Sequence, residues 1–355
     1  MKYIKKKFNY IFGNFNSIHM EKWSKYFEND ENYINISYEP IKNKKNIVNL
    51  NRNKNNLLIS SFFILIFLFK KFLKSKPKKI VIHYLNEVSL IILFLKYFFN
   101  YKIIIIPWGS DLNIDHGKKI RFLKKIICKK CDLIITDGYH IKNKLINTYK
   151  IDENKIKIFN FPINFDLLDT LKNDLKINKK QIIFSNRSLD DIYSIDVLIH
   201  AFKRFSKINH NYKLVIVGDG ELKNELMLLV NKLNLSDRVI FTGKLDFTKM
   251  INKLLDAEIF ISTSTTDAGL SSSIAEAIYL KKKIIVANNS DNNVWIKNYD
   301  NGLIFKTNDI ESLCDKINYL SKNNLSLQGK TYLNFVHNFS YNLIMPKIKD
   351  TIDNL

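Results

Sequence analysis

Cysteine is scarce in this chain, with three residues among 355, at positions 128, 131 and 314. An odd, sparse set of thiols does not build a disulfide framework, and it favours a reducing compartment. Cys128 and Cys131 form a C-x-x-C pair, yet no second Cys/His pair stands at the spacing of a zinc site. We therefore interpret them as packing thiols and expect no metal.

Long apolar runs are also missing. The longest, Leu57–Phe69, has thirteen residues, whereas a helix that spans a bilayer needs roughly 20. The basic start at Met1–Lys7 is followed by a short stretch broken by polar residues, which is not typical of a secretory signal. Two interpretations of Leu57–Phe69 stay open: a buried crossover helix, or a helix in a membrane interface beside the lysines that follow, Lys70, Lys71, Lys74 and Lys76.

Acidic residues are scarce in the first part of the chain only. Residues 1–150 hold 29 Lys and Arg against 10 Asp and Glu, a net charge of +19, whereas residues 151–355 hold 27 against 24, a net charge of +3. A coding bias toward lysine would act on both parts, so the asymmetry indicates an anionic partner. No RNA-recognition, zinc-finger or basic-zipper pattern is present, which argues against nucleic acid. An anionic membrane surface that carries a lipid-linked acceptor fits better.

Short apolar segments alternate with helical stretches along the whole chain. This pattern predicts an α/β fold of two Rossmann-like domains with a cleft between them, each with parallel strands covered by helices on both faces. We expect domains at 1–164 and 165–338, because Pro162 interrupts the last strand of the first half, and a C-terminal helix in 339–355. The predicted strands are Phe8–Phe12, Ile34–Tyr38, Lys79–His83, Lys102–Pro107, Leu133–Thr136, Lys155–Phe159, Gln181–Ser185, Lys213–Val217, Val239–Thr242, Glu258–Ser262, Lys283–Val286 and Gly302–Phe305.

The segment Asp267–Leu280, DAGLSSSIAEAIYL, is the most informative in the chain. A turn containing Gly269, Leu270 and Ser271 opens a helix that carries Glu276. A helix start of this kind presents unpaired N–H groups and the positive end of the helix dipole, which suits phosphate. A carboxylate one turn inside the helix suits ribose hydroxyls. An ordinary α/β crossover with a serine-rich cap is the competing interpretation of the same segment.

The ordered set of motifs resembles the retaining glycosyltransferases of the family 4 type, which have the GT-B fold. The similar segments are Phe12–Phe27, Val81–Asn86, Ile103–Leu112, Tyr212–Leu226, Asp237–Leu245, Asp267–Leu280 and Asn292–Phe305. The resemblance implies a first domain that binds the acceptor and a second domain that binds a nucleotide-diphosphate sugar. It also implies that the C-terminal helix crosses back to the first domain.

The resemblance assigns roles to individual residues. It implies catalytic roles for Arg187, Asp267, Glu276 and Asp111, donor binding by Gly13, Asn14, Arg187, Gly218, Gly220, Gly269, Leu270, Ser271 and Glu276, and acceptor binding by His19, His83, Trp108 and Asp111. The chain departs from the family at three places. Ala268 replaces the first of two acids, with Asp267 one residue earlier; Tyr193 stands in the place of a lysine; and Trp108 replaces a histidine found in many members.

A structural role competes with the functional one for several of these residues. Arg187 either clamps the diphosphate with two hydrogen bonds or pairs with Asp190 or Asp191. The two glycines after the second strand of the second half either contact the donor or only form a turn. Asp111 either serves the acceptor or caps the following segment, and the two histidines either face the acceptor or pack internally.

We expect a glycosyltransferase that moves a sugar from a nucleotide-diphosphate sugar to a saccharide or lipid-linked saccharide in cell-envelope polysaccharide synthesis, with retention of configuration. No cofactor is expected beyond this co-substrate. The expected location is cytoplasmic, on the inner face of the cytoplasmic membrane. Two alternatives stay open: another GT-B sugar-phosphate enzyme, such as a phosphorylase, and a non-catalytic sugar- or anion-binding protein with this fold.

Overall fold

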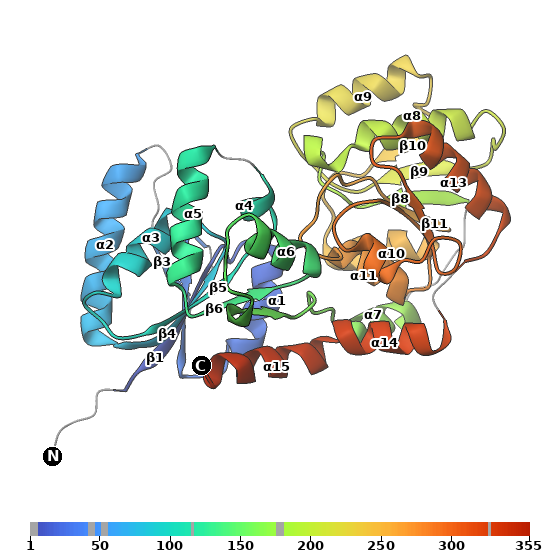
Figure 1. The fold of residues 1–355 in the computed structure, drawn as a ribbon. Helices are drawn as coiled ribbons and strands as arrows, with labels where there is room; N and C mark the ends of the chain where they lie inside the picture. The colour runs from blue at the N-terminus through green and yellow to red at the C-terminus, as the bar shows by residue number, and fades with distance from the viewer. Residues whose placement is uncertain (1–5, 42–46, 51–55, 115–116, 175–180, 326–327) are drawn as a thin grey trace. The chain divides into compact units, whose positions relative to one another are not determined.

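The computed structural model describes residues 6–41, 47–50, 56–114, 117–174, 181–325 and 328–355. Contacts between Cα atoms divide the chain into two compact units: Met1–Phe159 with Met345–Leu355, and Asn160–Ile344. Each unit contains one open parallel sheet with helices packed on it (Figure 1). The fold is therefore α/β, as the alternation of apolar segments predicts.

The sheet of the first unit has the order β3-β2-β1-β4-β5-β6-β7, and all its pairings are parallel. β3 was not predicted, because an edge strand of three residues is too short to show a hydrophobic period. The strands are β1 (Phe8–Gly13), β2 (Tyr33–Ser37), β3 (Ile47–Asn49), β4 (Pro77–His83), β5 (Lys102–Ile106), β6 (Leu133–Thr136) and β7 (Ile156–Ile158). The helices are α1 (Ile18–Phe27), α2 (Leu57–Lys74), α3 (Glu87–Leu95), α4 (Ser110–Asn113), α5 (Lys118–Lys130), α6 (Tyr139–Asn147) and the 3-10 turn η1 (Glu153–Lys155).

The end of the C-terminal helix α15 (Tyr341–Asp353) packs within the first unit. The ammonium group of Lys79 on β4 is buried and donates to the carbonyl oxygens of Ile352, at 2.6 Å, and Asp353, at 2.5 Å. The last carbonyls of a helix have no partners within the helix, and a buried cation supplies both charge and donors to them. Lys79 thus ties α15 to the sheet.

α2 is only half buried. Ser60, Ile64, Leu68 and Phe72 recur every four residues and face the sheet, with exposed fractions of 7% or less. The opposite face is apolar as well, and it is exposed: the exposed fraction of Phe63 is 64%. α2 is thus a crossover helix between parallel strands β3 and β4, as one of the two interpretations expects, but it is buried on one face only. Within the described ranges, no helix combines the length and apolar character needed to cross a membrane.

The sheet of the second unit has the order β10-β9-β8-β11-β12-β13, again with parallel pairings. Its strands are β8 (Ile182–Ser185), β9 (Lys213–Ile216), β10 (Val239–Phe241), β11 (Ile259–Ser262), β12 (Lys283–Ala287) and β13 (Leu303–Phe305). Its helices are α7 (Phe165–Asp174), α8 (Ile195–Phe205), α9 (Lys223–Lys232), α10 (Phe247–Asp256), α11 (Ser272–Tyr279), α12 (Asn292–Trp295), α13 (Ile310–Lys322), α14 (Gly329–Phe339) and the 3-10 turn η2 (Asp191–Tyr193).

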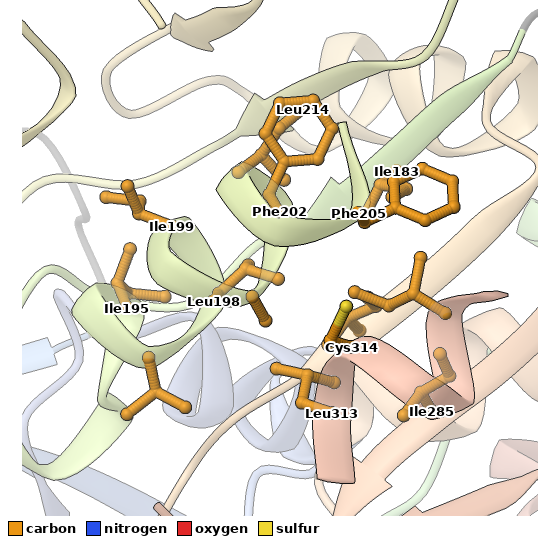
Figure 2. Close-up of a cluster of buried hydrophobic side chains, with 14 of the residues drawn as sticks. Ile183, Ile195, Leu198, Ile199, Phe202, Phe205, Leu214, Ile285, Leu313 and Cys314 are labelled. Carbon is orange, nitrogen blue, oxygen red and sulfur yellow. The ribbon is translucent and has the colours of Figure 1, made fainter. Parts of the chain in front are cut away.

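Helix α8 anchors one core of the second unit. Its apolar residues follow the 3.6-residue helical period and are buried. Figure 2 shows them meeting the strands and α13: the labelled side chains are Ile183, Ile195, Leu198, Ile199, Phe202, Phe205, Leu214, Ile285, Leu313 and Cys314. A close-packed core on this face of the sheet fixes the strands whose carboxyl ends carry the candidate site.

Candidate functional site

The loops that follow β8, β9 and β11 form the candidate site of the second unit. β8 lies between β9 and β11 in the sheet, so the chain leaves β8 toward β9 on one side and later returns to β11 on the other. Ligands of open α/β sheets bind outside the carboxyl ends of strands at such a switch point. Arg187, Gly218 and Asp267 stand on these three loops.

Arg187 is the centre of this site. Its exposed fraction is 8%. One terminal nitrogen donates to the Ser273 hydroxyl at 3.0 Å, and the other donates to the Asp267 carboxylate in a close ion pair. The Tyr193 ring lies 4.6 Å from the guanidinium carbon, within the range of cation–π attraction. Among the described residues, Arg187 Nε has no hydrogen-bond partner.

Asp267, rather than the nearby Asp190 or Asp191, is the aspartate that pairs with Arg187 in the described structure. Burial raises the pKa of its carboxyl, and the Arg187 charge and hydrogen bond act in the opposite direction. Its backbone is also fixed, because Asp267 N–H donates to the Ser290 hydroxyl at 2.7 Å and that hydroxyl donates to the Asp267 carbonyl at 2.6 Å. The pair therefore holds the guanidinium in place.

The turn that carries Tyr193 is held by the loop after β11. The Thr263 hydroxyl donates to the Tyr193 carbonyl at 2.7 Å, and both the N–H and the hydroxyl of Thr265 donate to the Ile192 carbonyl. Tyr193, which stands where the resembled family has a lysine, thus has its backbone fixed beside Arg187. It adds an aromatic face to the site where a lysine would add a second positive charge.

Gly218 and Gly220 are required by backbone packing. A Cβ atom on Gly218, whose φ is +153°, would lie 2.3 Å from the Arg187 carbonyl oxygen. A Cβ atom on Gly220 would lie 2.5 Å from the Leu189 carbonyl carbon. Glycine therefore lets the loop after β9 approach the loop that carries Arg187. A hydrogen bond joins the two loops, since Leu189 N–H donates to the Asp219 carbonyl at 3.1 Å. Contact with a donor stays a prediction for both glycines.

Helix α11 begins beside Arg187. Ser271 makes no side-chain cap, and its hydroxyl lies 3.2 Å from the hydroxyl of Ser273. Ser273 and Glu276 are three residues apart, so they share one face of α11, and both are buried. The side chain of Leu270 belongs to the core, and Gly269 before it is buried. The helix start, the Arg187 guanidinium and the Glu276 carboxylate are thus neighbours on one edge of the sheet.

In the first unit, Asp111 is fully buried and links two loops. Its carboxylate accepts from Leu85 N–H and Trp108 N–H, both at 3.0 Å, so it joins the loop after β4 to the loop after β5. Burial raises the pKa of Asp111 to about 6, although these two N–H groups and the charge of Lys124 lower it. The geometry supports a positioning role for Asp111, and direct action on an acceptor stays a prediction.

His83 and Trp108 contact each other at the ends of β4 and β5. Trp108 Nε1 donates to His83 Nδ1 at 3.3 Å, which places the imidazole proton on Nε2. The Trp23 ring packs edge-on against His83, with 4.5 Å between ring centroids. His83 is fully buried and Trp108 only partly, so Trp108 is the more accessible of the two candidate acceptor residues.

The loop after β1 completes the edge of the first sheet. A Cβ atom on Gly13 would lie 2.6 Å from the sulfur of Met20, so a larger residue there would require the Met20 side chain to move. Asn14 organises the turn into α1: its side-chain oxygen accepts from Asn16 N–H at 3.1 Å. His19 lies on α1, and its side chain falls outside the described residues.

The sequence-based reasoning did not identify three contacts of this site: the Arg187–Asp267 pair, the Arg187–Ser273 hydrogen bond and the Ser290 hydroxyl under Asp267. The serine run at Ser271–Ser273 was a usable signal for the second. For the other two no local signal exists, because the partners are far apart in the sequence.

Two units, each with a parallel sheet, helices packed on it and polar loops at the carboxyl ends of its strands, make up the type of fold that solved GT-B glycosyltransferases also have. Residues 169–339 match the family described as Glycosyl transferases group 1. This match lies within the second unit. The chain is a glycosyltransferase, and its fold is GT-B.

Relatives and solved structures agree. Two uncharacterized glycosyltransferases of Methanocaldococcus jannaschii are similar: one is 29% identical over 85% of this chain and 75% of its own length, the other 27% identical over 65% and 60%. An N-acetylgalactosaminyltransferase of Campylobacter jejuni, named for an undecaprenol-linked saccharide, is 23% identical over 69% of this chain and 66% of its own length. A glycosyltransferase from Rickettsia africae has a similar fold, with a TM-score of 0.77, 19% identity and 98% of both chains covered. Anabaena HepE, solved with UDP, has a TM-score of 0.79, 11% identity, and 98% and 100% covered.

Proposed function

We propose that the protein transfers a sugar from a nucleotide-diphosphate sugar to a saccharide or a lipid-linked saccharide, with retention of anomeric configuration, at an anionic membrane surface on the cytoplasmic side. The observation that carries the proposal is the position of the Arg187 guanidinium beside the first turn of α11. A guanidinium and a helix start are complementary to a diphosphate, and they stabilise it as it departs.

Each part of the second-unit site has a proposed task. Arg187 binds the diphosphate and Asp267 orients Arg187, while the N–H groups at the start of α11 contact a phosphate. Glu276, on the same face as Ser273, accepts hydrogen bonds from ribose hydroxyls. Gly218 and Gly220 bring the neighbouring loop close enough for its backbone to line the donor. Gly13 and Asn14 remain proposed donor contacts of the first unit.

The acceptor is assigned to the first unit. Trp108, His83 and the loops joined by Asp111 are the proposed contacts, together with His19. The Campylobacter jejuni relative named for an undecaprenol-linked saccharide supports a lipid-linked acceptor, and the solved complex of Anabaena HepE with UDP supports a nucleotide diphosphate as leaving group.

Donor binding by a panel of nucleotide sugars tests the proposal. Isothermal titration should detect binding of at least one donor and of its nucleoside diphosphate. Arg187→Ala should weaken diphosphate binding by roughly ten- to a hundredfold, because a hydrogen bond to a charged group contributes about 1.5–3 kcal/mol. Arg204→Ala, which changes an exposed arginine of α8, is the matched control and should bind as the wild type does. Wild-type affinity in Arg187→Ala would refute the placement of the diphosphate, and nuclear magnetic resonance of the product would test retention.

A further inference from the structure

We propose that helices α2, α3 and α5 of the first unit form a docking surface for an anionic membrane, in which the apolar side chains of α2 enter the leaflet and lysines contact lipid phosphates. This inference rests on the proposed function and deepens it, because it names the surface that brings the enzyme to a lipid-linked acceptor. The three helices are neighbours: α2 packs on α3, and α3 packs on α5 (Figure 1).

The first observation is the outward face of α2. The exposed fractions are 86% for Leu58, 55% for Ile59, 60% for Phe62 and 64% for Phe63. The buried face, with Ile64 and Leu68, already supplies the contacts that hold the helix on the sheet. The exposed phenylalanines lie on the opposite face from these contacts. Contiguous exposed apolar patches mark interaction sites.

The second observation is that the apolar surface continues onto the neighbouring helices. Phe69 of α2 packs edge-on against Phe98, which follows α3, with 5.7 Å between ring centroids. Phe98 itself has an exposed fraction of 58%, and Phe122 on α5 has one of 62%. A groove of about 430 Å³ lies between α3 and α5, lined by Leu90, Leu93, Phe94, Tyr97 and Ile126, with Lys96 and Lys130 completing the lining. Lys96 is ion-paired with Asp132 at 2.7 Å. The apolar walls match the acyl chain of a lipid, and Lys130 matches its phosphate.

The third observation is the charge of the same helices, which decides between possible occupants. α2 carries three Lys, and α5 carries seven Lys or Arg, of which Lys124 is buried and donates to the Asp111 carbonyl. The only acid on the three helices is Glu87. Lys118 and Lys119 at the start of α5 are exposed. A second copy of this chain would bring the same positive charge to the contact and repel it, whereas an anionic bilayer is complementary in both charge and apolarity.

Vesicle flotation tests the docking surface on the full-length protein. The wild type should float with vesicles of phosphatidylglycerol and phosphatidylcholine and not with phosphatidylcholine alone, and binding should weaken as salt rises. Phe62→Ser with Phe63→Ser should lower the partition coefficient by roughly tenfold or more, since each loses an apolar insertion. Lys118→Glu with Lys119→Glu should lower the partition coefficient on anionic vesicles without removing an apolar group. Leu228→Ser on α9, at a side chain with an exposed fraction of 68%, is the control and should leave binding unchanged.

Donor binding measured on the same variants separates this inference from the proposed function. Loss of vesicle binding in both double variants, with donor binding and thermal unfolding unchanged, supports the docking surface. A wild type that binds donor but ignores anionic vesicles overturns the docking surface and leaves sugar transfer standing. A wild type that floats but binds no donor overturns the proposed function alone. If sedimentation shows a dimer that Phe62→Ser with Phe63→Ser dissociates, and vesicles are not bound, the face is an interface between copies and the inference is overturned.

Discussion

Replacing Asp267 by asparagine tests how the buried ion pair serves the site. The Arg187 and Asp267 side chains have exposed fractions of only 9% and 12%, so solvent screens the pair weakly. Removing one partner of a buried pair costs about 3–5 kcal/mol, because the other charge remains buried and uncompensated. Asparagine keeps an oxygen that accepts from the guanidinium, so we expect the lower end, roughly 3 kcal/mol of unfolding free energy, in denaturant titrations without ligand.

The same substitution should have the opposite effect on nucleotide binding. If a diphosphate binds Arg187 as proposed, the Asp267 carboxylate and the diphosphate share one guanidinium in the wild type, and the two anions repel each other. With asparagine at 267, the diphosphate restores the missing negative charge, so its affinity should rise by about tenfold, which corresponds to about 1.4 kcal/mol. Turnover should fall, since the guanidinium loses the group that orients it.

Isothermal titration with a nucleoside diphosphate and thermal unfolding with and without it measure both effects. Asp315→Asn, on an exposed residue of α13, is the matched control and should change neither. If Asp267→Asn weakened diphosphate binding as much as Arg187→Ala and left the unfolding free energy unchanged, Asp267 would be a donor contact and not the partner that positions Arg187.

Three further predictions follow from single residues. Glu276→Gln should weaken donor binding roughly ten- to a hundredfold with little change in unfolding, if Glu276 accepts from ribose; titration with unmodified and 2′-deoxy nucleotide would show whether the loss depends on the hydroxyl. Asp111 holds its proton more tightly in the folded than in the unfolded protein, so its contribution makes the unfolding free energy fall as pH rises from its ordinary pKa of 3.8 to about 6. In Asp111→Asn, denaturant titrations should show an unfolding free energy that depends less on pH between these two values. An unchanged pH dependence would contradict the raised pKa. Lys79→Met should lower the unfolding free energy by roughly 1.5–3 kcal/mol, because the carbonyls of Ile352 and Asp353 lose a charged donor. The melting temperature should be unaltered in the control Lys232→Met, at an exposed lysine of α9.

Most of the fold could be predicted from the sequence. Buried parallel strands leave continuous runs of Ile and Val, as in Lys102–Ile106, and each predicted strand overlaps a strand of the structure. β3 is the strand that was not predicted, because it has only three residues, lies at the edge of the sheet and has no such run. The hydrophobic pattern also located the loops of the candidate site, because ligands of parallel α/β sheets bind outside the carboxyl ends of the strands.

The partners of the site residues could not be predicted in the same way. Arg187 and Asp267 are 80 positions apart, and their contact exists only because β8 and β11 are neighbours in the sheet. The hydrophobic pattern predicted that Asp111 follows a strand. It did not predict that the carboxylate accepts from the N–H groups of Leu85 and Trp108, which lie on two different loops. The sequence shows that residue 111 is an aspartate, whereas its burial depends on how the whole unit packs.

The sequence by itself determined that the chain has two parallel sheets covered by helices, that its first part is strongly basic, and that Leu57–Phe69 is apolar except for Ser60 and Ser61. Only the tertiary structure decided which face of α2 is buried: Ile64 and Leu68 meet the sheet, and Phe62 and Phe63 remain in solvent. The physical reason is that two adjacent serines do not form a polar stripe along a helix, so the sequence does not show which side faces the sheet. Its orientation is set by the shape of the surface it packs against, and that surface is built by strands distant in the sequence.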